Sequence, residues 1–401
     1  MQKHTETLIS IRRKNNDTKY LTKEEIKKLG SSLLKLQRGL TGDRNLAGKN
    51  YMQDPLFFGA YLLYYWNVSY IQIEKILEKI SVPAKNSFSI LECGSGPAPG
   101  TCAILDKILD KNPAAKIEVF LTDSSGNALK TAEKIISRDY KNVSVTTKVS
   151  NLEKDEIPEG KYDFILLSHV LNELWKNQEN KIDNRFEYVS KLSKKLTQDG
   201  MLILNEPSIL EASRNLIMVR DKLLENGMKL LSPCPESECT KCPVLETPNH
   251  TCHAEYFISG VKILDDLSRE AGLNRVSVKM SYFVFNASTI GIPPEGVAEG
   301  NEGESRKYGK RDGEAGTPQK TNVLKGKIVS EGMLNKSGRV RFLVCNGKER
   351  IPLSAKQNDT EAKKQGFFSL KRYDNVEIAN PEVRENGFGM TGATLKIVKH
   401  S

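Results

Sequence analysis

Four of the seven cysteines in this 401-residue chain lie within nineteen residues of one another. Clustered cysteines in a chain without an export signal are typical of metal ligands rather than of disulfides. Four thiolates hold zinc tetrahedrally, and they hold a [4Fe–4S] cluster equally well, so the spacing leaves both metals open. His250 or His253 could replace one thiolate in a zinc site. The four cysteines are Cys234, Cys239, Cys242 and Cys252.

A glycine-rich loop at residues 92–100, Glu-Cys-Gly-Ser-Gly-Pro-Ala-Pro-Gly, follows a short apolar run. Glycines let the backbone approach a ligand closely, and the helix that follows would direct its first amides at the same place. A dinucleotide loop would read Gly-x-Gly-x-x-Gly, whereas here the third glycine comes one position late and two prolines intervene. Asp123 ends the next apolar run, where an acidic residue binds ribose hydroxyls. Gly94, Gly96 and Asp123 therefore predict a nucleotide-type cofactor site.

Ser168 and His169 end another apolar run, and Glu206 follows the next one. Ligands of open α/β sheets bind outside the carboxyl ends of the strands, so we expect these residues at the mouth of the same crevice. His169 either contacts a substrate or packs against, or caps, a helix, and the second role is the commoner one for a lone histidine.

Apolar runs alternate with helical patterns from about residue 87 onward. This alternation predicts an α/β fold with a parallel, doubly wound sheet and helices on both faces. The expected helices include residues 127–136 and 186–196. The expected strands are residues 88–93, 117–121, 143–147, 164–167 and 201–204.

The chain divides into four predicted parts. The first is basic and helical, with a capped helix start at residues 21–25 and many aromatics that more plausibly fill a core than stack on bases. The third contains seven glycines and three prolines in 33 residues, which is typical of a linker. Short strand-like runs after it fit a small β-barrel, of the oligonucleotide-binding kind. The parts are 1–86, the central domain 87–287 with the Cys-rich loop 233–253, the linker 288–320, and the β-rich domain 321–401.

The net charge of +10 is concentrated at the two ends of the chain. Residues 1–50 carry twelve Lys/Arg against five Asp/Glu, and residues 321–401 carry fifteen against eight. Two basic ends around a mildly acidic middle indicate contact with a polyanion such as RNA. The longest apolar run has eleven residues, whereas a membrane-spanning helix needs about twenty, so an integral membrane protein is excluded.

Together these motifs resemble one family, the methyltransferase-like small-ribosomal-subunit assembly proteins of mitochondria and bacteria. The resemblance covers roughly residues 50–290, with a weaker echo around Cys345. It implies a class I S-adenosylmethionine methyltransferase domain with a Rossmann-like fold, a helical N-terminal extension and a small C-terminal β-barrel-like domain. The residues that carry it are 91–97, 168–174, 205–207, 233–235, 242–243 and 252–253.

The resemblance also implies a bound [4Fe–4S] cluster. Cys234, Cys242 and Cys252 match its three central ligands and Cys345 matches the fourth, so that Cys239 would be a spare or an alternative ligand. Cys345 would then hold the C-terminal domain against the central one.

For S-adenosylmethionine, the resemblance carries over Glu92, Gly94, Gly96, Asp123, Asn151 and Ser168. Two of these depart from the common pattern: Glu92 stands where Asp is usual, and Asn151 stands where many methyltransferases have an Asp facing the adenine. The motifs of amino-group and carbon-5 pyrimidine methylation are missing after the fourth strand, so no catalytic residue is assigned.

These observations predict a methyltransferase-like factor that binds the small ribosomal subunit and its rRNA and supports assembly or translation. One alternative is an active rRNA methyltransferase. A more distant alternative is a zinc-stapled methyltransferase with a non-RNA substrate. The N-terminal segment contains Glu6 and Asp17 among its basic residues, which is unlike a transit peptide, so we expect the bacterial cytoplasm rather than mitochondria.

Overall fold

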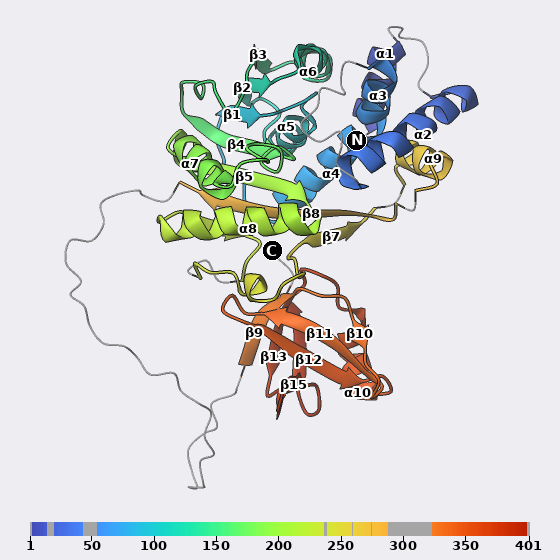
Figure 1. The fold of residues 1–401 in the computed structure, drawn as a ribbon, viewed down its shortest axis with the longest axis vertical. Coiled ribbons are helices and arrows are strands. Elements are labelled where there is room, and N and C mark those ends of the chain that lie inside the picture. The colour runs from blue at the N-terminus through green and yellow to red at the C-terminus, as the bar shows by residue number, and fades with distance from the viewer. Residues whose placement is uncertain are drawn as a thin grey trace, which may run out of the picture.

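The computed structural model describes residues 2–13, 20–42, 54–235, 239–258, 260–273, 275–287 and 323–398. The described residues form two eight-stranded sheets, one in the central domain and one near the C-terminus (Figure 1). No helix among them is long and apolar enough to cross a membrane. The predicted linker, residues 288–320, lies outside the described residues.

The first sheet has the strand order β3-β2-β1-β4-β5-β8-β6, with β7 paired to β8. Strands β1 to β5 are parallel, whereas β8 runs antiparallel to β5, β6 and β7. The predicted doubly wound parallel sheet is confirmed, and each of the five expected strands is present. The bounds are β1 Ser87–Cys93, β2 Lys116–Asp123, β3 Val143–Val149, β4 Tyr162–Ser168, β5 Leu196–Pro207, β6 Lys229–Ser232, β7 Ala254–Phe257 and β8 Ser277–Asn286.

Strand β4 lies at the centre of this sheet, and the sequence from Tyr162 to Leu167 is buried throughout. The sequence of a strand that helices cover on both faces is a nearly continuous apolar run, and such a run predicts β4. The chain turns in opposite directions from β1 and from β4, so their carboxyl ends open into a crevice.

Helices cover both faces of the first sheet, and a separate hydrophobic core lies between the helices and the sheet on each face. Helices α1, α4, α5 and α6 pack on one face, while α7 and α8 cover the other (Figure 1). Helix α2 packs against α3 and α9 beside the sheet. The bounds are α1 Gln2–Arg13, α2 Lys23–Gln37, α3 Pro55–Ala60, α4 Trp66–Leu77, α5 Pro99–Lys111, α6 Gly126–Asp139, α7 Lys181–Ser193, α8 Leu210–Glu225 and α9 Lys262–Glu270.

The N-terminal helices are fixed to the sheet domain by polar contacts. The predicted helix start is confirmed, because Thr22 and Glu25 form a reciprocal capping box at α2. His4 of α1 is fully buried, and its ring nitrogens lie 2.6 Å from Asp139 Oδ2 and 2.8 Å from Asp106 Oδ2. These two carboxylates belong to α6 and α5, so one side chain joins three helices.

The aromatic residues of the N-terminal region fill a core, as expected. Tyr64, Trp66 and Tyr70 are buried, and the Trp66 and Tyr70 rings stack with centroids 5.5 Å apart. Tyr51 lies outside the described residues. Packing inside the protein leaves these buried rings unavailable for stacking on bases.

The C-terminal sheet curls into a small barrel. Its order is β14-β15-β12-β11-β9-β13-β16, with β10 paired to β11 and the short helix α10 (Thr360–Lys364) after β12. Strand β15 pairs with β12, and strand β16 pairs with β13. The segment from Gly387 to Val398 contains both β15 and β16, so it closes the barrel. This pairing matches the expected oligonucleotide-binding type. The bounds are β9 Val323–Ile328, β10 Met333–Leu334, β11 Arg339–Cys345, β12 Arg350–Lys356, β13 Asn375–Ala379, β14 Glu382–Arg384, β15 Gly387–Gly389 and β16 Thr394–Val398.

The barrel contacts the central domain through the Cys-rich loop and strands β7 and β8 (Figure 1). The Tyr373 and Tyr282 rings lie 6.1 Å apart between centroids, and Arg350 Nη1 lies 3.0 Å from His250 Nδ1. Lys371 lies above the ring of Phe257. The Cys-rich loop therefore lies at the interface of the two domains, with residues 246–250 exposed to solvent.

Candidate functional site

A pocket of about 870 Å³ opens at the carboxyl ends of β1, β2 and β4. Five of the six residues predicted to bind the cofactor line it, and only Glu92 does not. Residues from the N-terminal helices, among them Tyr65 and Gln72, form the wall opposite the glycine loop. The five residues are Gly94, Gly96, Asp123, Asn151 and Ser168.

The glycine loop needs its glycines for two separate reasons. Gly94 and Gly96 have φ values of +69° and +53°, which side chains other than glycine rarely adopt. A Cβ atom on Gly94 would also lie 2.1 Å from Cγ2 of Val170. The loop therefore reaches its position only with glycine at residue 94.

Asp123 holds the loop from the neighbouring strand. Its carboxylate accepts hydrogen bonds from the backbone amides of Gly96 at 2.8 Å and Ser125 at 2.7 Å. Burial raises the pKa of Asp123 above its usual range, and the two amides oppose this rise. The carboxylate thus lies at the pocket wall where ribose hydroxyls were expected.

Glu92 lies beneath the pocket rather than in its lining. Its Oε2 accepts hydrogen bonds from the amide of Thr101 at 3.0 Å and from its hydroxyl at 2.6 Å. Helix α5 starts after Ala98, which provides no side-chain cap, so Glu92 satisfies an amide of the first turn instead. Burial raises the pKa of Glu92 to about 7. A cofactor contact by Glu92 stays a prediction, and the contacts seen position the helix.

His169 has a defined hydrogen-bonding state at the end of β4. Gln72 donates from Nε2 to the carbonyl of Lys279, so its Oε1 is the acceptor that lies 2.6 Å from His169 Nε2. Nε2 must therefore carry the proton, which leaves Nδ1 as an acceptor. Burial lowers the pKa of His169 to about 4, so the ring is neutral near pH 7. Its backbone has φ +61°, a strained conformation often found at functional sites.

Asn205 and Glu206 lie beside His169 on β5. Asn205 Nδ2 donates to Ser168 Oγ at 3.0 Å and to Gln72 Oε1 at 3.3 Å. Glu206 is buried, and one of its carboxylate oxygens has no partner among the described residues. Burial raises the pKa of Glu206 to about 7. His169 lines the pocket, whereas Glu206, which was expected at the same crevice, is buried and is not among the lining residues.

The four proposed ligand cysteines occupy the interface between the domains. Cys234 follows β6, Cys242 precedes a short helical turn, Cys252 precedes β7, and Cys345 ends β11 of the barrel. Burial, with smaller contributions from the neighbouring Cys252 and Cys345, raises the pKa of Cys234 to about 12, and Arg220 acts in the opposite direction. The pKa of Cys242 is also raised, first by burial and then by Cys252. The fold therefore brings Cys345 of the barrel into the electrostatic neighbourhood of the three loop cysteines.

The described residues contain no group of three or more side chains arranged to hold a metal ion. The surroundings of the thiols nevertheless suit an anionic centre. Arg220 Nη2 lies 3.8 Å from Cys234 Sγ, and the buried Nε of Arg220 has no partner among the described residues. The Tyr373 hydroxyl lies 3.2 Å from Cys252 Sγ. Donors directed at sulfur fit thiolates that hold a metal.

Cys239 differs from the other cysteines of the loop. Its Sγ donates to the carbonyl of Lys241 at 3.1 Å. It is close enough to Cys345 to raise the pKa of that thiol slightly, after burial and Cys252. Both candidates for the fourth ligand, Cys239 and Cys345, thus lie near the same centre.

Sequence analysis did not find the arginines that shape this loop. Arg214 of α8 donates to the backbone carbonyls of Val244, Leu245, Thr247 and His250. Arg220, two turns further along the helix, donates to the carbonyl of Thr240 at 3.1 Å. The only available signal was two arginines at i and i+6 just before the cysteines, which is also an ordinary pattern for a surface helix.

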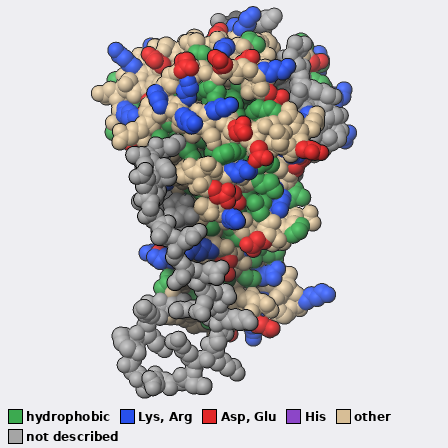
Figure 2. All heavy atoms as spheres, turned by 60° about the vertical axis from the view of Figure 1, so that its left-hand side comes forward, with side chains coloured by type: hydrophobic (Ala, Val, Ile, Leu, Met, Phe, Trp, Pro, Cys, Tyr) green, Lys and Arg blue, Asp and Glu red, His purple; other side chains and the backbone are tan. Residues whose placement is uncertain are grey.

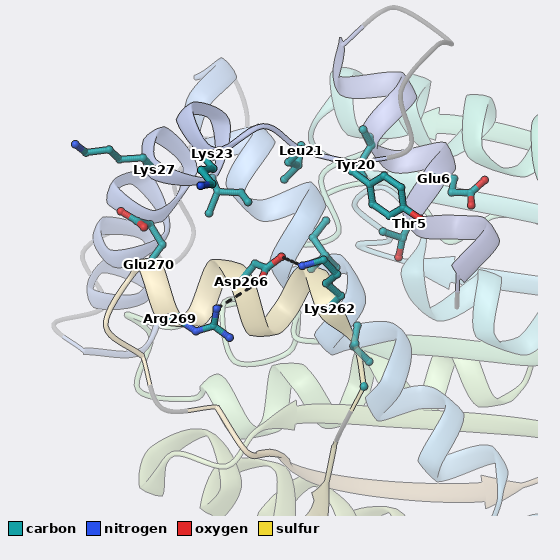
Figure 3. Close-up of a pocket in the computed structure, with 15 residues that line it drawn as sticks. Thr5, Glu6, Tyr20, Leu21, Lys23, Lys27, Lys262, Asp266, Arg269 and Glu270 are labelled. Atoms are coloured by element: carbon teal, nitrogen blue, oxygen red, sulfur yellow. Dashed lines mark hydrogen bonds and ion pairs between the residues drawn. The ribbon is translucent and has the colours of Figure 1, made fainter.

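A second cavity, of about 980 Å³, lies between α1, α2 and α9 (Figure 3). Ile9, Leu21 and Ile26 line it together with charged residues at the rim. Asp266 pairs there with Lys262 at 2.8 Å and with Arg269 at 3.8 Å. None of the predicted site residues lines this cavity.

A model of one protein family matches residues 57–291, more than half of the chain. The family is described as Mitochondrial small ribosomal subunit Rsm22. No curated protein matches the chain.

Similar solved structures are methyltransferases. One, from Listeria monocytogenes, is a putative class I S-adenosylmethionine-dependent enzyme, with 11% identity, a TM-score of 0.39, and coverage of 74% of this chain and 92% of that one. A methyltransferase from Pyrococcus furiosus has 12% identity, a TM-score of 0.34, and coverage of 54% and 82% respectively. The strand order confirms the predicted Rossmann-like α/β fold.

Proposed function

Because the chain belongs to the family described as Mitochondrial small ribosomal subunit Rsm22, we propose that it is an S-adenosylmethionine-binding factor of the small ribosomal subunit that supports assembly or translation. The observation that carries the cofactor part of this proposal is the pocket at the ends of β1, β2 and β4. There the glycine loop and the carboxylate of Asp123 face the same space.

The residues of the pocket fit the cofactor. Gly94 and Gly96 would admit it close to the backbone, Asp123 would bind ribose hydroxyls, and Asn151 and Ser168 would line its two sides. Tyr65 also lines this pocket, and its hydroxyl is buried without a partner among the described residues. When bound, S-adenosylmethionine supplies an electrophilic methyl group.

We propose that the two basic ends of the chain contact ribosomal RNA. On the face shown in Figure 2, Lys/Arg and Asp/Glu side chains are interspersed, so this proposal rests on the ends and not on that face. Binding to phosphates releases counterions and weakens steeply with salt. An oligonucleotide-binding type of barrel at the basic C-terminal end is a suitable partner for single-stranded RNA.

A second candidate function, methyl transfer to RNA, is favoured by His169. Its neutral ring lines the pocket next to Ser168 and offers Nδ1 as a hydrogen-bond acceptor, although a pKa of about 4 makes the ring a weak base. Strained backbone at this position is an arrangement that packing alone does not require. Mass mapping of small-subunit RNA from cells with and without the gene separates the two functions: a missing methyl group establishes the enzyme.

We further propose that Cys234, Cys242, Cys252 and Cys345 hold a [4Fe–4S] cluster. The shared neighbourhood of the four thiols and the unpartnered donor of Arg220 support this ligand set. A cluster would supply one-electron redox chemistry or, with no redox role, would join the two domains. Iron, sulfide and zinc contents of anaerobically purified protein test the proposal. About four irons per chain are expected, lost in Cys345→Ser and kept in Cys239→Ser. One zinc without sulfide would overturn it.

Co-sedimentation with isolated small subunits tests the ribosomal proposal. The chain should sediment with the subunits at low salt and dissociate progressively as salt rises. If the chain does not sediment with small subunits at any salt concentration, the ribosomal proposal is contradicted.

Asp123→Asn should abolish S-adenosylhomocysteine binding in calorimetry, with Glu118→Gln, an exposed change on the same strand, as the matched control.

A further inference from the structure

Two cations lie buried beside the cysteine centre, one from each domain. Arg220 of α8 is 2% exposed, and Lys327 of β9 is 6% exposed. Burying a positive charge is costly unless a negative group compensates it. The surroundings of each residue therefore show what charge the centre must carry.

Arg220 has only part of its hydrogen-bonding capacity satisfied. Its Nη1 donates to Asp221 Oδ1 at 2.7 Å and to the carbonyl of Thr240, while Nη2 faces the sulfur of Cys234. Asp221 is shared, because its other oxygen accepts from the amide of Cys242 at 3.0 Å. The guanidinium thus directs Nη2 at the sulfur of Cys234, and its buried Nε has no partner among the described residues.

Lys327 approaches the same thiols from the barrel. It pairs directly across from Cys345 on β11, and directly opposed residues of an antiparallel pair project on the same face. Its ammonium lies 5.4 Å from the centre of the Tyr373 ring, and the Tyr373 hydroxyl contacts Cys252. Burial lowers the pKa of Lys327 to about 8, while the nearby Cys234 acts in the opposite direction.

The neighbouring Lys325 shows that this placement is specific. Lys325 lies two residues earlier on β9, is exposed, and pairs with Glu377 at 3.1 Å. Residues two apart on a strand share a face, so the docked central domain covers this face at Lys327 and not at Lys325.

We propose that Arg220 and Lys327 are the counter-charges of an anionic tetrathiolate centre, and that they make docking of the barrel depend on the metal-loaded state. Four thiolates around a divalent ion, or around a doubly positive cluster, leave two formal negative charges beside Lys327 and Arg220, and Arg220 is also paired with Asp221. This inference rests on the metal centre proposed above, but it holds for zinc as well as for iron and sulfide.

The charge balance predicts opposite effects in the two states of the site. With the metal present, each cation stabilises the centre and the interface. Without metal-bound thiolates, Arg220 keeps Asp221 as a partner at 2.7 Å, whereas Lys327 stays buried beside the thiols, so docking is weaker. A purely structural lysine would stabilise both states or neither.

Lys327→Met tests this in the full-length chain, with Lys325→Met as the matched control. The first measurement is the rate at which zinc-loaded protein loses zinc to excess EDTA. Lys327→Met should lose it about tenfold faster than wild type, and Lys325→Met at the wild-type rate. Arg220→Met should also be faster, and Arg220→Lys should restore most of the retention.

The second measurement is hydrogen exchange of the β9 and β11 amides in metal-free protein. Metal-free Lys327→Met should be protected at least as well as metal-free wild type. Equal zinc loss in Lys327→Met and Lys325→Met, or weaker protection of Lys327→Met in both states, would overturn the inference. Wild type that binds zinc but no iron–sulfur cluster overturns only the cluster proposal, whereas wild type that binds no metal overturns both.

Discussion

Lys327 and Cys345 occupy directly opposite positions on the antiparallel strands β9 and β11, next to the barrel face that meets the Cys-rich loop. The two strands approach so closely at this point that only glycine fits beside them. A Cβ atom on Gly326 would lie 2.6 Å from the carbonyl oxygen of Cys345 and 2.6 Å from Cγ1 of Val344. The strand pair therefore positions both a proposed ligand and its counter-charge.

Gly326→Ala should separate β9 from β11 and displace Cys345. We expect a loss of about 1–3 kcal/mol of barrel stability, as for other overpacked sites, together with weaker metal retention. Urea unfolding and metal analysis measure the two effects. Gly126→Ala is a useful control, since its φ is not positive and its added Cβ would meet only Val149 Cγ2, at an ordinary 3.5 Å. Retention of metal at the wild-type level would show that the close approach is unimportant for the centre.

Gly94→Ala should abolish or greatly weaken cofactor binding. The new methyl group would meet Val170 within the pocket wall, in addition to the strain of φ +69°. Gly272→Ala separates the two causes, because Gly272 has φ +65° but open space around its Cβ position. We expect both variants to lose about 1 kcal/mol of stability from the backbone. In calorimetry with S-adenosylhomocysteine, Gly94→Ala alone should lose affinity.

Glu92→Gln should change how stability depends on pH. The pKa of Glu92 is raised from 4.5 to about 7 by burial, so the folded chain binds the proton more tightly than the unfolded chain does. This group therefore contributes full stability below pH 4.5 and loses it as the pH rises toward 7. Between pH 4.5 and 7.5, wild type should lose about 1–3 kcal/mol more than Glu92→Gln in urea unfolding. Parallel pH profiles of the two proteins would contradict this.

His4→Gln should detach helix α1 from the sheet domain. His4 contacts Asp106 and Asp139, and its removal leaves two largely buried carboxylates close together. Loss of one member of a buried charged network costs about 3–5 kcal/mol. Hydrogen exchange should show faster exchange of the α1 amides, while Lys3→Gln, an exposed neighbour, should have a small effect. Unchanged exchange in His4→Gln would mean that α1 is held by apolar packing alone.

The sequence alone was sufficient to predict the strands in which apolar residues recur with a clear period. The five parallel strands and the barrel strands β9, β11, β13 and β16 were predicted from short runs or alternations of apolar residues, which are buried in β1 and β4 but not in β3. Strands β6 and β7 have four residues each, too few to show a hydrophobic period. The position of β8, antiparallel between β5 and β6, depends on contacts between distant parts of the chain, so local sequence does not predict it.

The candidate site could be predicted only where the residue type itself implies a ligand. Glycines and thiols do so, and they led to the cofactor loop and the cysteine loop. Arg220 and Lys327 gave no such signal, because a buried cation has the same sequence appearance as an exposed one. For Glu92, the residue type was known but not the direction of its side chain, which the structure turns toward Thr101.

The pairing of β8 with β6 and β7 has a consequence for the order in which the chain is synthesised. The loop with Cys234, Cys242 and Cys252 leaves the ribosome before β8, the strand that joins its two ends in the sheet. Cys345 follows later still, and the barrel that carries it is closed only by the segment from Gly387 to Val398. A four-thiol centre can therefore form only after translation is almost complete, so occupancy of this centre would distinguish finished chains from nascent ones.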